Sequence, residues 1–365
     1  MVFRSRFRSS VKKFNSTYMD QNLEKPLVSV LMPVYNAEEY IEKSIESILN
    51  QTYKNFEFII VDDFSSDNSV KIICLFSDSR IRLITKNNNS GIAKTLNIGL
   101  ENAKGKYIIR MDADDICHPN RIHKQVEFLE NNEDYILCGS NYKTIDENII
   151  VKLPQNNESI KLGLLSNCCI AHPTVAIRFN VLKQYNIHYD SIMEPAEDYD
   201  LWVSLASKGK YYNLQEELLY YRVHEEQISN KRKKEQDQKS FAVKIKYISS
   251  FYKKIIEKEE VILKKILLSS ERITKEDVES FSKFIKSMKK NNESNSYFNK
   301  DEFNIFLSGL EELLLENYFA KYERYTISDI INYYKINREY GLKFSFKKKF
   351  GLFLKSVFFY KIKTR

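Results

Sequence analysis

The chain has 365 residues, which is long enough for about two domains of ordinary size. It is 43% hydrophobic and 29% charged, with only nine glycines and six prolines, and this composition excludes disordered, collagen-like and linker-rich proteins. The five cysteines include no Cys-x-x-Cys pair, which argues against a disulfide framework and favours a reducing compartment. No run of 18 apolar residues is present, so we expect neither a transmembrane helix nor a signal peptide. We therefore expect a cytoplasmic protein.

The overall charge of +8 is distributed unevenly along the chain. Residues 1–25 carry a net charge of +4, residues 26–224 carry −7 and residues 225–365 carry +11. We therefore expect a basic, flexible N-terminal segment over 1–25, an acidic domain over 26–224 and a basic C-terminal region over 225–365.

Strand and helix patterns alternate through the first third of the chain. The predicted strands cover 28–32, 56–61, 81–84 and 107–111. The predicted helices cover 38–50, a short stretch around 70–73, 92–103, and a segment from after Pro119 to about 131. This alternation is typical of βα units, so the sequence predicts an α/β fold with a Rossmann-like, mostly parallel sheet flanked by helices.

Further along, the strand signals become sparse. Strand-like stretches occur near 135–138 and 174–178, and a helix pattern covers 198–207 around the single tryptophan, Trp202. After about residue 225 the sequence is rich in lysine, isoleucine and leucine, which predicts a mainly helical region up to residue 365. The polar stretch 291–296 is predicted to be a loop between two of these helices.

Two predicted strands end in acidic clusters. Asp62 and Asp63 follow the second strand, and Asp112, Asp114 and Asp115 follow the fourth. In open α/β sheets, ligands bind at the carboxyl ends of the strands. Aspartates one residue apart are unstable as buried, unpaired anions, because desolvation and mutual repulsion raise their pKa values. Mn²⁺ or Mg²⁺ would resolve this conflict and would also bind the phosphates of a substrate, so we expect such a cofactor.

Four segments occur together in a recognisable order and spacing. They are Val28–Asn36 (VSVLMPVYN), Phe58–Ser69 (FIIVDDFSSDNS), Lys104–Asp115 (KGKYIIRMDADD) and the pair Glu197-Asp198. In these segments the chain resembles bacterial glycosyltransferase family 2 over residues 26–224. The resemblance implies a GT-A fold and a metal-dependent, inverting transfer of a sugar from a nucleoside diphosphate sugar, with UDP favoured. The implied acceptor is a saccharide or a lipid-linked glycan, in the synthesis of a surface polysaccharide such as lipopolysaccharide or capsule.

The resemblance also implies roles for single residues. The nucleotide-sugar is expected to contact Pro33, Tyr35, Asp63, Lys94, Asp112 and Ala113. The metal is expected to bind Asp114 and Asp112, with Asp114 as the more direct ligand and His224 as an additional candidate. The share of Asp115 in this work is left open.

An inverting displacement needs a base that removes the proton of the acceptor hydroxyl. The pair Glu197-Asp198 opens the predicted Trp202 helix and resembles the family's Glu-Asp motif, in which the aspartate is the usual base. Asp200 is a rival candidate, but it points about 200° around the helix from Asp198. His172 resembles a residue on the acceptor side, and Arg222 belongs to a late Arg-x-His loop that can close over the diphosphate.

The end of the chain combines cations with aromatic residues. Residues 335–365 carry a net charge of +9, interleaved with phenylalanines and a tyrosine. Segment 341–365 could contact an anionic membrane, which would make the enzyme peripheral on the inner face of the cytoplasmic membrane. It could equally pack on the preceding helices. A nucleic-acid partner is not expected, because no RNA-binding motif accompanies the charge.

Two alternative functions remain at this point. The same domain could transfer sugar to a polyprenyl phosphate, an acceptor that needs no general base, or it could be an inactive scaffold. A sugar-nucleotide pyrophosphorylase or a dehydrogenase is disfavoured, because no glycine-rich loop follows the first strand.

Overall fold

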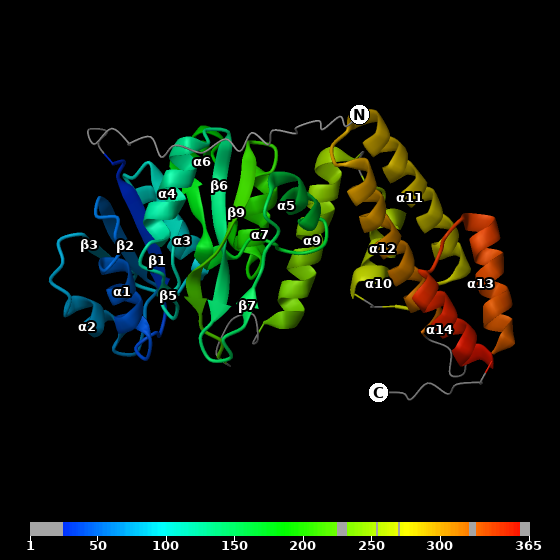
Figure 1. Ribbon diagram of the computed structural model, residues 1–365. Coiled ribbons are helices and arrows are strands. Elements are labelled where there is room, and N and C mark those ends of the chain that lie inside the picture. Colours follow the sequence, from blue (N-terminus) through cyan, green and yellow to red (C-terminus); the bar gives the residue numbers. More distant parts are fainter. Residues whose placement is uncertain (1–24, 225–231, 253–254, 269–270, 321–325, 358–365) are drawn as a thin grey trace, which may run out of the picture.

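The computed structural model describes residues 25–224, 232–252, 255–268, 271–320 and 326–357. An α/β part and a group of helices lie side by side along the long axis of the molecule (Figure 1). The expected flexible segment 1–25 lies almost entirely outside the described residues, as does the end of the predicted membrane segment, 358–365.

The first half of the sheet is parallel. Its strands are β1 (Val28–Val34), β2 (Phe56–Asp62), β3 (Ile81–Thr85) and β4 (Tyr107–Arg110). They lie in the order β3-β2-β1-β4, with Val28 beside both Phe56 and Tyr107. The chain moves outward from β1 on one side and returns to its other side with β4. This reversal of strand order places the ends of β1 and β4 where α/β sheets usually bind ligands.

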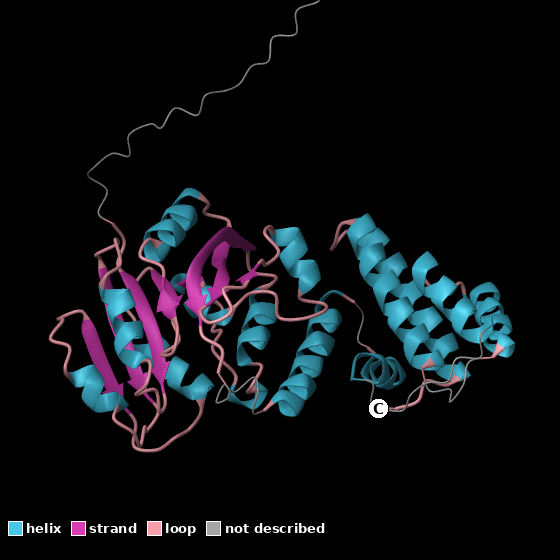
Figure 2. Cartoon of the chain, turned by 60° about the horizontal axis from the view of Figure 1, so that its bottom comes forward, coloured by secondary structure: helices cyan, strands magenta, loops and turns pink. Residues whose placement is uncertain are grey.

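The second half of the sheet is mixed. It contains β5 (Ile116–Cys117), β6 (Tyr135–Thr144), β7 (Ile150–Val151), β8 (Ala176–Arg178) and β9 (Lys210–Tyr221). Strand β8 pairs antiparallel with both β4 and β6, whereas β6 and β9 are parallel. The parallel pairing that the sequence predicts is thus confirmed for β1 to β4, and antiparallel pairs extend the sheet beyond them (Figure 2).

Helices cover both faces of this sheet. They are α1 (Ile41–Leu49), α2 (Ser69–Cys74), α3 (Ile92–Asn102), α4 (Arg121–Asn131), α5 (Asn157–Gly163), α6 (Phe179–Gln184) and α7 (Glu197–Leu205), with 3-10 turns at His172–Thr174 and Ser191–Met193. Alternate residues of β1 point to opposite faces: Val30 joins one apolar core with α1 and α4, and Leu31 joins the other with α3 and α7. At Gly99 of α3 an added Cβ would lie 1.9 Å from a Leu31 methyl, so glycine permits this close helix–sheet contact.

The C-terminal region is helical, as expected. Its helices are α9 (Lys233–Phe251), α10 (Glu257–Leu268), α11 (Lys275–Asn295), α12 (Lys300–Phe319), α13 (Ile327–Tyr340) and α14 (Phe346–Val357). The predicted loop over 291–296 is wrong, because α11 continues to Asn295 and ends at Ser296 in a left-handed conformation. The buried amide of Asn292 explains the extra turn, since it bonds to both the N–H and the carbonyl of Phe298. Within the described residues, no helix combines the length and apolarity needed to cross a bilayer.

Candidate functional site

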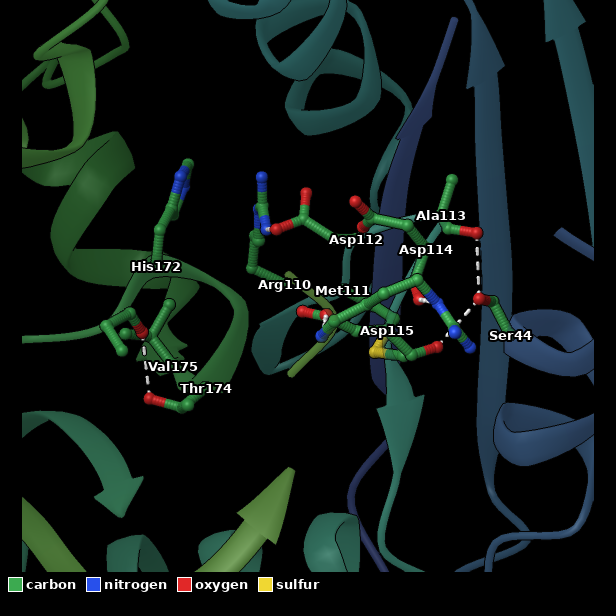
Figure 3. A network of polar contacts seen from close by, with 12 residues as sticks. Ser44, Arg110, Met111, Asp112, Ala113, Asp114, Asp115, His172, Thr174 and Val175 are labelled. Carbon is green, nitrogen blue, oxygen red and sulfur yellow. Dashed lines mark hydrogen bonds and ion pairs between the residues drawn. The ribbon is translucent and has the colours of Figure 1, made fainter. Parts of the chain in front are cut away.

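The turn after β4 carries three aspartates and is fastened to helix α1. The Ser44 hydroxyl lies 2.8 Å from the carbonyl oxygen of Ala113 and 2.7 Å from that of Asp115 (Figure 3). The N–H of Met111 donates to the Leu31 carbonyl, which continues the contact with β1 for one residue beyond the end of β4. These bonds hold the backbone of the turn, so that its carboxylates are presented by a fixed frame.

The three carboxylates converge. Asp112, Asp114 and Asp115 each offer an oxygen, and these oxygens lie within 4.8 Å of one another. Burial, followed by the nearby charges of Asp112 and Asp114, raises the pKa of Asp115 well above its usual range. The Oδ2 atom of Asp115 is buried without a hydrogen-bond partner in the described part of the chain. Such a group costs free energy unless something binds it.

The loop after β9 closes this cluster from one side. The N–H of Arg222 donates to Asp115 Oδ1 at 2.9 Å, and its Nε donates to the carbonyl of Asp114 at 3.0 Å. His224 Nε2 lies 2.9 Å from Asp114 Oδ2. The Arg222 guanidinium also stacks 4.4 Å from the Tyr40 ring centroid. The predicted Arg-x-His loop therefore lies beside the aspartates, about 110 residues away from them in sequence.

A buried arginine stands on the other side of the cluster. Arg110, the last residue of β4, is almost fully buried and forms an ion pair with Asp112. Figure 3 shows its guanidinium between the imidazole of His172 and the carboxylate of Asp112. Burial raises the pKa of Asp112, and the neighbouring Arg110 charge opposes that rise. Arg110 therefore helps to keep the partly exposed Asp112 carboxylate ionised.

The Glu197–Asp198 pair begins α7, as predicted. The Glu197 side chain is buried, its Oε2 atom has no hydrogen-bond partner among the described residues, and burial followed by the Asp198 charge raises its pKa to about 8. Asp198 Oδ1 accepts the N–H of Tyr199 at 2.6 Å, and its Oδ2 lies 3.6 Å from the Cys168 thiol. Burial also raises the pKa of Asp198, although that hydrogen bond and the Arg110 charge oppose the rise.

Asp200 is differently placed from Asp198. Its carboxylate forms an ion pair of 2.7 Å with Lys246 of α9. This contact ties α7 to the first C-terminal helix and gives the buried Asp200 a structural partner.

His172 is buried behind the site. Its Nε2 is 2.9 Å from the Tyr189 hydroxyl, and its ring packs edge-on against Trp202. Burial, and then the Arg110 charge, lowers the pKa of His172 well below its usual range, so the ring is neutral at physiological pH. A neutral, hydrogen-bonded imidazole can orient its neighbours without adding charge to the site.

The loop after β2 and the loop before α3 meet at Asp63. Its carboxylate accepts the N–H groups of Ser90 and Gly91, at 2.9 and 3.0 Å, and forms an ion pair with Lys86. Asp63 is thus bonded to its own chain. Pro33 lies in β1 opposite Val61, and Tyr35 follows it with a half-exposed ring.

Lys94 is exposed on the first turn of α3. It lines a polar groove of about 480 Å³ together with Lys86, Ser90 and Asn97. Because Lys86 and Ser90 also contact Asp63, the groove adjoins Asp63. None of the polar contacts found for the described residues joins Lys94 to the aspartate cluster.

Sequence reasoning missed three residues that shape this site: Arg110, Lys86 and Ser44. Arg110 stands two residues before Asp112, and an arginine at the end of an otherwise apolar strand was the signal that could have found it. Lys86 and Ser44 gave no comparable signal. Each acts through a contact with a residue at least 23 positions away, which no local pattern encodes.

The residues present fit a divalent cation. The donors are carboxylate oxygens, with an imidazole next to them, and one buried oxygen lacks a partner in the described chain. Such hard ligands suit Mg²⁺ and Mn²⁺.

Comparison with known proteins identifies the family. A model of glycosyl transferase family 2 matches residues 29–186. The chain is 37% identical over 211 residues to WfaP of Escherichia coli, a UDP-Glc:alpha-D-GlcNAc-diphosphoundecaprenol beta-1,3-glucosyltransferase, and the match covers 57% of this chain and 82% of that relative. The chain belongs to glycosyltransferase family 2. It is therefore a glycosyltransferase, as its motifs predict.

Solved structures confirm the fold of this family 2 enzyme. TarS 1–349 of S. aureus, in complex with UDP-GlcNAc, aligns over 86% of this chain and 91% of its own, with a TM-score of 0.55 and 18% identity. The mannosyltransferase PcManGT from Pyrobaculum calidifontis, in complex with GDP-Man and Mn²⁺, aligns over 82% and 89%, with a TM-score of 0.52 and 15% identity. At these identities the likeness concerns the fold alone, and it confirms the predicted GT-A architecture followed by a helical region.

Proposed function

We propose that this family 2 enzyme transfers a sugar, with inversion, from a UDP-linked donor to a saccharide or lipid-linked glycan during surface polysaccharide synthesis. One observation carries the proposal. The buried guanidinium of Arg110 forms an ion pair with Asp112 of the aspartate cluster after β4, and its charge also opposes the rise in the pKa values of the Glu197–Asp198 pair of α7. We infer that a donor-binding centre and a separate carboxylate base lie on either side of Arg110, as a single in-line displacement requires.

We propose that the donor's diphosphate binds beside the aspartate cluster. Asp114 and Asp112 would hold Mn²⁺ or Mg²⁺, with His224 next to Asp114 as an additional ligand. A bound divalent cation would neutralise the charge that develops on the leaving diphosphate. The Arg222 guanidinium, stacked on Tyr40 at the edge of the cluster, is placed to add a second positive charge there. The Mn²⁺ in the PcManGT complex supports the choice of metal.

The nucleoside would bind along the neighbouring loops. Tyr35, two residues after Pro33, offers a half-exposed ring for the base. Asp63 holds the backbone of Ser90 and Gly91, and Ser90 lines the adjoining groove. Ala113 and Asp112 would contact the ribose. Lys94 would bind the diphosphate from the groove that it lines together with Lys86 and Ser90. WfaP, whose name specifies UDP-Glc, supports a UDP-linked donor.

We propose Asp198 as the base that accepts the proton of the acceptor hydroxyl. The acceptor oxygen forms a bond to the anomeric carbon while the bond from that carbon to the diphosphate breaks. Burial raises the pKa of Asp198, which makes its carboxylate a better proton acceptor than an exposed aspartate. Glu197 lies beside it in a buried position, and neutral His172 packs behind the acceptor side.

The proposed acceptor is a lipid-linked saccharide. WfaP, by its name, acts on a GlcNAc-diphosphoundecaprenol, and this supports an acceptor of that class. An acceptor held by a lipid would place the enzyme in the cytoplasm, at the inner face of the cytoplasmic membrane.

The first test is donor hydrolysis without an acceptor. UDP-, GDP- and dTDP-sugars are incubated with the enzyme, with and without Mn²⁺, and nucleotide release is measured. We expect metal-dependent release of UDP that is lost in Asp114→Asn and kept in Asp146→Asn, a matched change at an exposed aspartate. Release from GDP- or dTDP-sugars alone would contradict the donor assignment. Absence of Mn²⁺-dependent UDP binding in calorimetry would favour the inactive scaffold.

A further inference from the structure

Helix α14 carries a row of exposed phenylalanines beside α13. Leu352 and Ser356 are buried against the rest of the chain. On the neighbouring side of the helix the exposed fractions are 85% for Phe346, 52% for Phe350 and 49% for Phe353. At about 100° per residue, these three phenylalanines lie within an arc of about 60°. Contiguous exposed apolar side chains of this kind mark sites that bind a protein, a ligand or a membrane.

Helix α13 extends this apolar surface. Its residues Ile327, Ile331 and Tyr334 are each about half exposed and lie on one side of the helix. Tyr334 lines a shallow cavity of about 140 Å³ together with Phe346, Phe350 and Phe353, so the exposed side chains of the two helices are continuous. The α13–α14 face is defined here by the following residues: Ile327, Ile331, Tyr334, Phe346, Phe350, Phe353 and Leu354.

The same two helices are strongly basic. Between residues 327 and 357 the sequence has seven lysines and arginines and only two acidic residues. Asp329 is buried in the N-terminal cap of α13, and Glu339 lies 3.7 Å from Lys275. Lys348 is bound to Glu312 and Glu316 of α12. The other basic residues are Lys335, Arg338, Lys343, Lys347, Lys349 and Lys355.

Charge decides which occupant fits the α13–α14 face. A second copy of this chain would bring one set of lysines against another, and the repulsion would oppose the apolar contact. A purely apolar partner would leave the cations unused. An anionic bilayer matches both features, because phenylalanines enter the boundary below the headgroups while lysines stay among the phosphates.

We propose that the α13–α14 face docks this enzyme onto an anionic lipid bilayer. The inference adds a partner to the proposed function and gives a place to the proposed lipid-linked acceptor. It can fail separately, because its test measures binding to lipid and not sugar transfer.

The test is sedimentation of the full chain with vesicles. Vesicles of phosphatidylcholine alone are compared with vesicles in which about one lipid in three is phosphatidylglycerol. We expect binding to the anionic vesicles only, and its loss at high salt, because the Debye length shrinks to about 3 Å at 1 M. Phe350→Ser/Phe353→Ser should weaken the partition coefficient at least about ten-fold. Lys343→Glu/Lys347→Glu should lower the partition coefficient at least about 30-fold, because each lysine near the surface contributes a factor of about five or more.

Matched controls separate the α13–α14 face from general surface effects. Leu75→Ser/Ile305→Ser removes two exposed apolar side chains elsewhere, and Lys264→Glu/Lys286→Glu reverses two exposed lysines on α10 and α11. Apart from the effect that the changed net charge of the lysine variant has at long range, neither control should change lipid binding by more than about two-fold. Donor hydrolysis and circular dichroism show that each variant is folded.

Several results would overturn the proposal. Equal binding to neutral and anionic vesicles would remove the role of charge. Loss of binding in the lysine variant but not in the phenylalanine variant would indicate a general polyanion surface. A dimer in light scattering that the phenylalanine variant abolishes would identify the α13–α14 face as an interface between copies. Failure of the wild-type chain to bind any vesicle would end the proposal outright.

Discussion

The buried charge of Arg110 opposes the effect of burial on the acidic groups of this site. Arg110 lies among Asp112, Asp115 and the Glu197–Asp198 pair, and its charge opposes the effect of burial on their pKa values. Without a cation at this point, several carboxyl groups would be forced to share protons before any donor binds. One arginine at the end of β4 therefore lets a crowded acidic site exist in the folded protein.

The effect of replacing Asp198 distinguishes the proposed reaction from transfer to a polyprenyl phosphate. A hydroxyl acceptor needs a base, so Asp198→Asn should lower the transfer rate by about 10²–10⁴-fold. The donor contacts lie elsewhere, so UDP affinity should change little. Because the pKa of Asp198 is raised, the wild-type kcat/KM should increase with pH through a range above that of an ordinary aspartate. Initial rates over pH 4 to 9 measure this, and an active Asp198→Asn enzyme would favour a phosphate acceptor.

Glu197 should lower the free energy of unfolding as the pH rises. Its pKa of about 8 lies above the value of about 4.3 in an unfolded chain, so the folded state binds the extra proton between these values. The stability it contributes is fully present below about pH 4.3 and is lost as the pH rises towards 8. We expect Glu197→Gln to be more stable than wild type at pH 8.5, on the order of 2 kcal/mol, and similar at pH 4.5.

Urea unfolding at the two pH values measures this difference. Glu133→Gln is the matched control, because Glu133 is exposed on the surface, and it should change the free energy of unfolding little at either pH. A Glu197→Gln protein that is no more stable than wild type at pH 8.5 would show that Glu197 is not strained by burial.

At the scale of elements, two glycines should respond oppositely to the same substitution. Gly91, before α3, has φ +92°, and an added Cβ would lie 2.5 Å from a Glu194 carboxylate oxygen. That carboxylate accepts the N–H of Ala93 at 2.7 Å and so ties the start of α3 to the segment before α7. Gly91→Ala should therefore lower the free energy of unfolding by more than about 1 kcal/mol.

Gly309 supplies the opposite case. It lies inside α12, and in the described part of the chain nothing beyond the adjacent residues and the backbone of its own helix comes within 4 Å of an added Cβ. Gly309→Ala should raise the free energy of unfolding by about 0.5–1 kcal/mol, because alanine loses less backbone entropy in a helix. Urea midpoints of the two variants test the pair together. A Gly91→Ala protein as stable as wild type would mean that the Glu194 carboxylate can move away from the added Cβ without loss of stability.

Local patterns predicted the elements that carry the site, and they failed where distant contacts decide. β1, β2, β4 and the start of α7 follow from hydrophobic periodicity and acidic strand ends. β9 was missed because its burial alternates only over its first five residues and its pairing with β6 is interrupted by register shifts. The acidic residues of the site could be named from sequence. The partners of Asp112 and Asp63 could not, because Arg110 and Lys86 become partners only in the folded chain.

At the scale of the whole molecule, one apolar core runs through both parts of the chain. Leu31 of the sheet, Trp202 of α7, Tyr247 of α9 and Leu314 of α12 belong to the same cluster of buried side chains. This core alone therefore marks no boundary, and the polar contacts of α9 with the catalytic part bear on the boundary predicted at residue 224. We propose that α9 belongs with the catalytic domain and that the boundary follows it.

Contacts of α9 with the catalytic part support this boundary. Lys246 pairs with Asp200, the Tyr247 hydroxyl donates to the Lys161 carbonyl, and Gln236 donates to the Pro195 carbonyl. A fragment of residues 1–224 would expose the apolar surface that Val243 and Tyr247 cover and would leave Asp200 buried without its cation. We expect that fragment to aggregate, whereas residues 1–250 should remain monomeric and unfold cooperatively. Size-exclusion chromatography and thermal unfolding of both fragments decide between the boundaries, and equal behaviour would restore the one at residue 224.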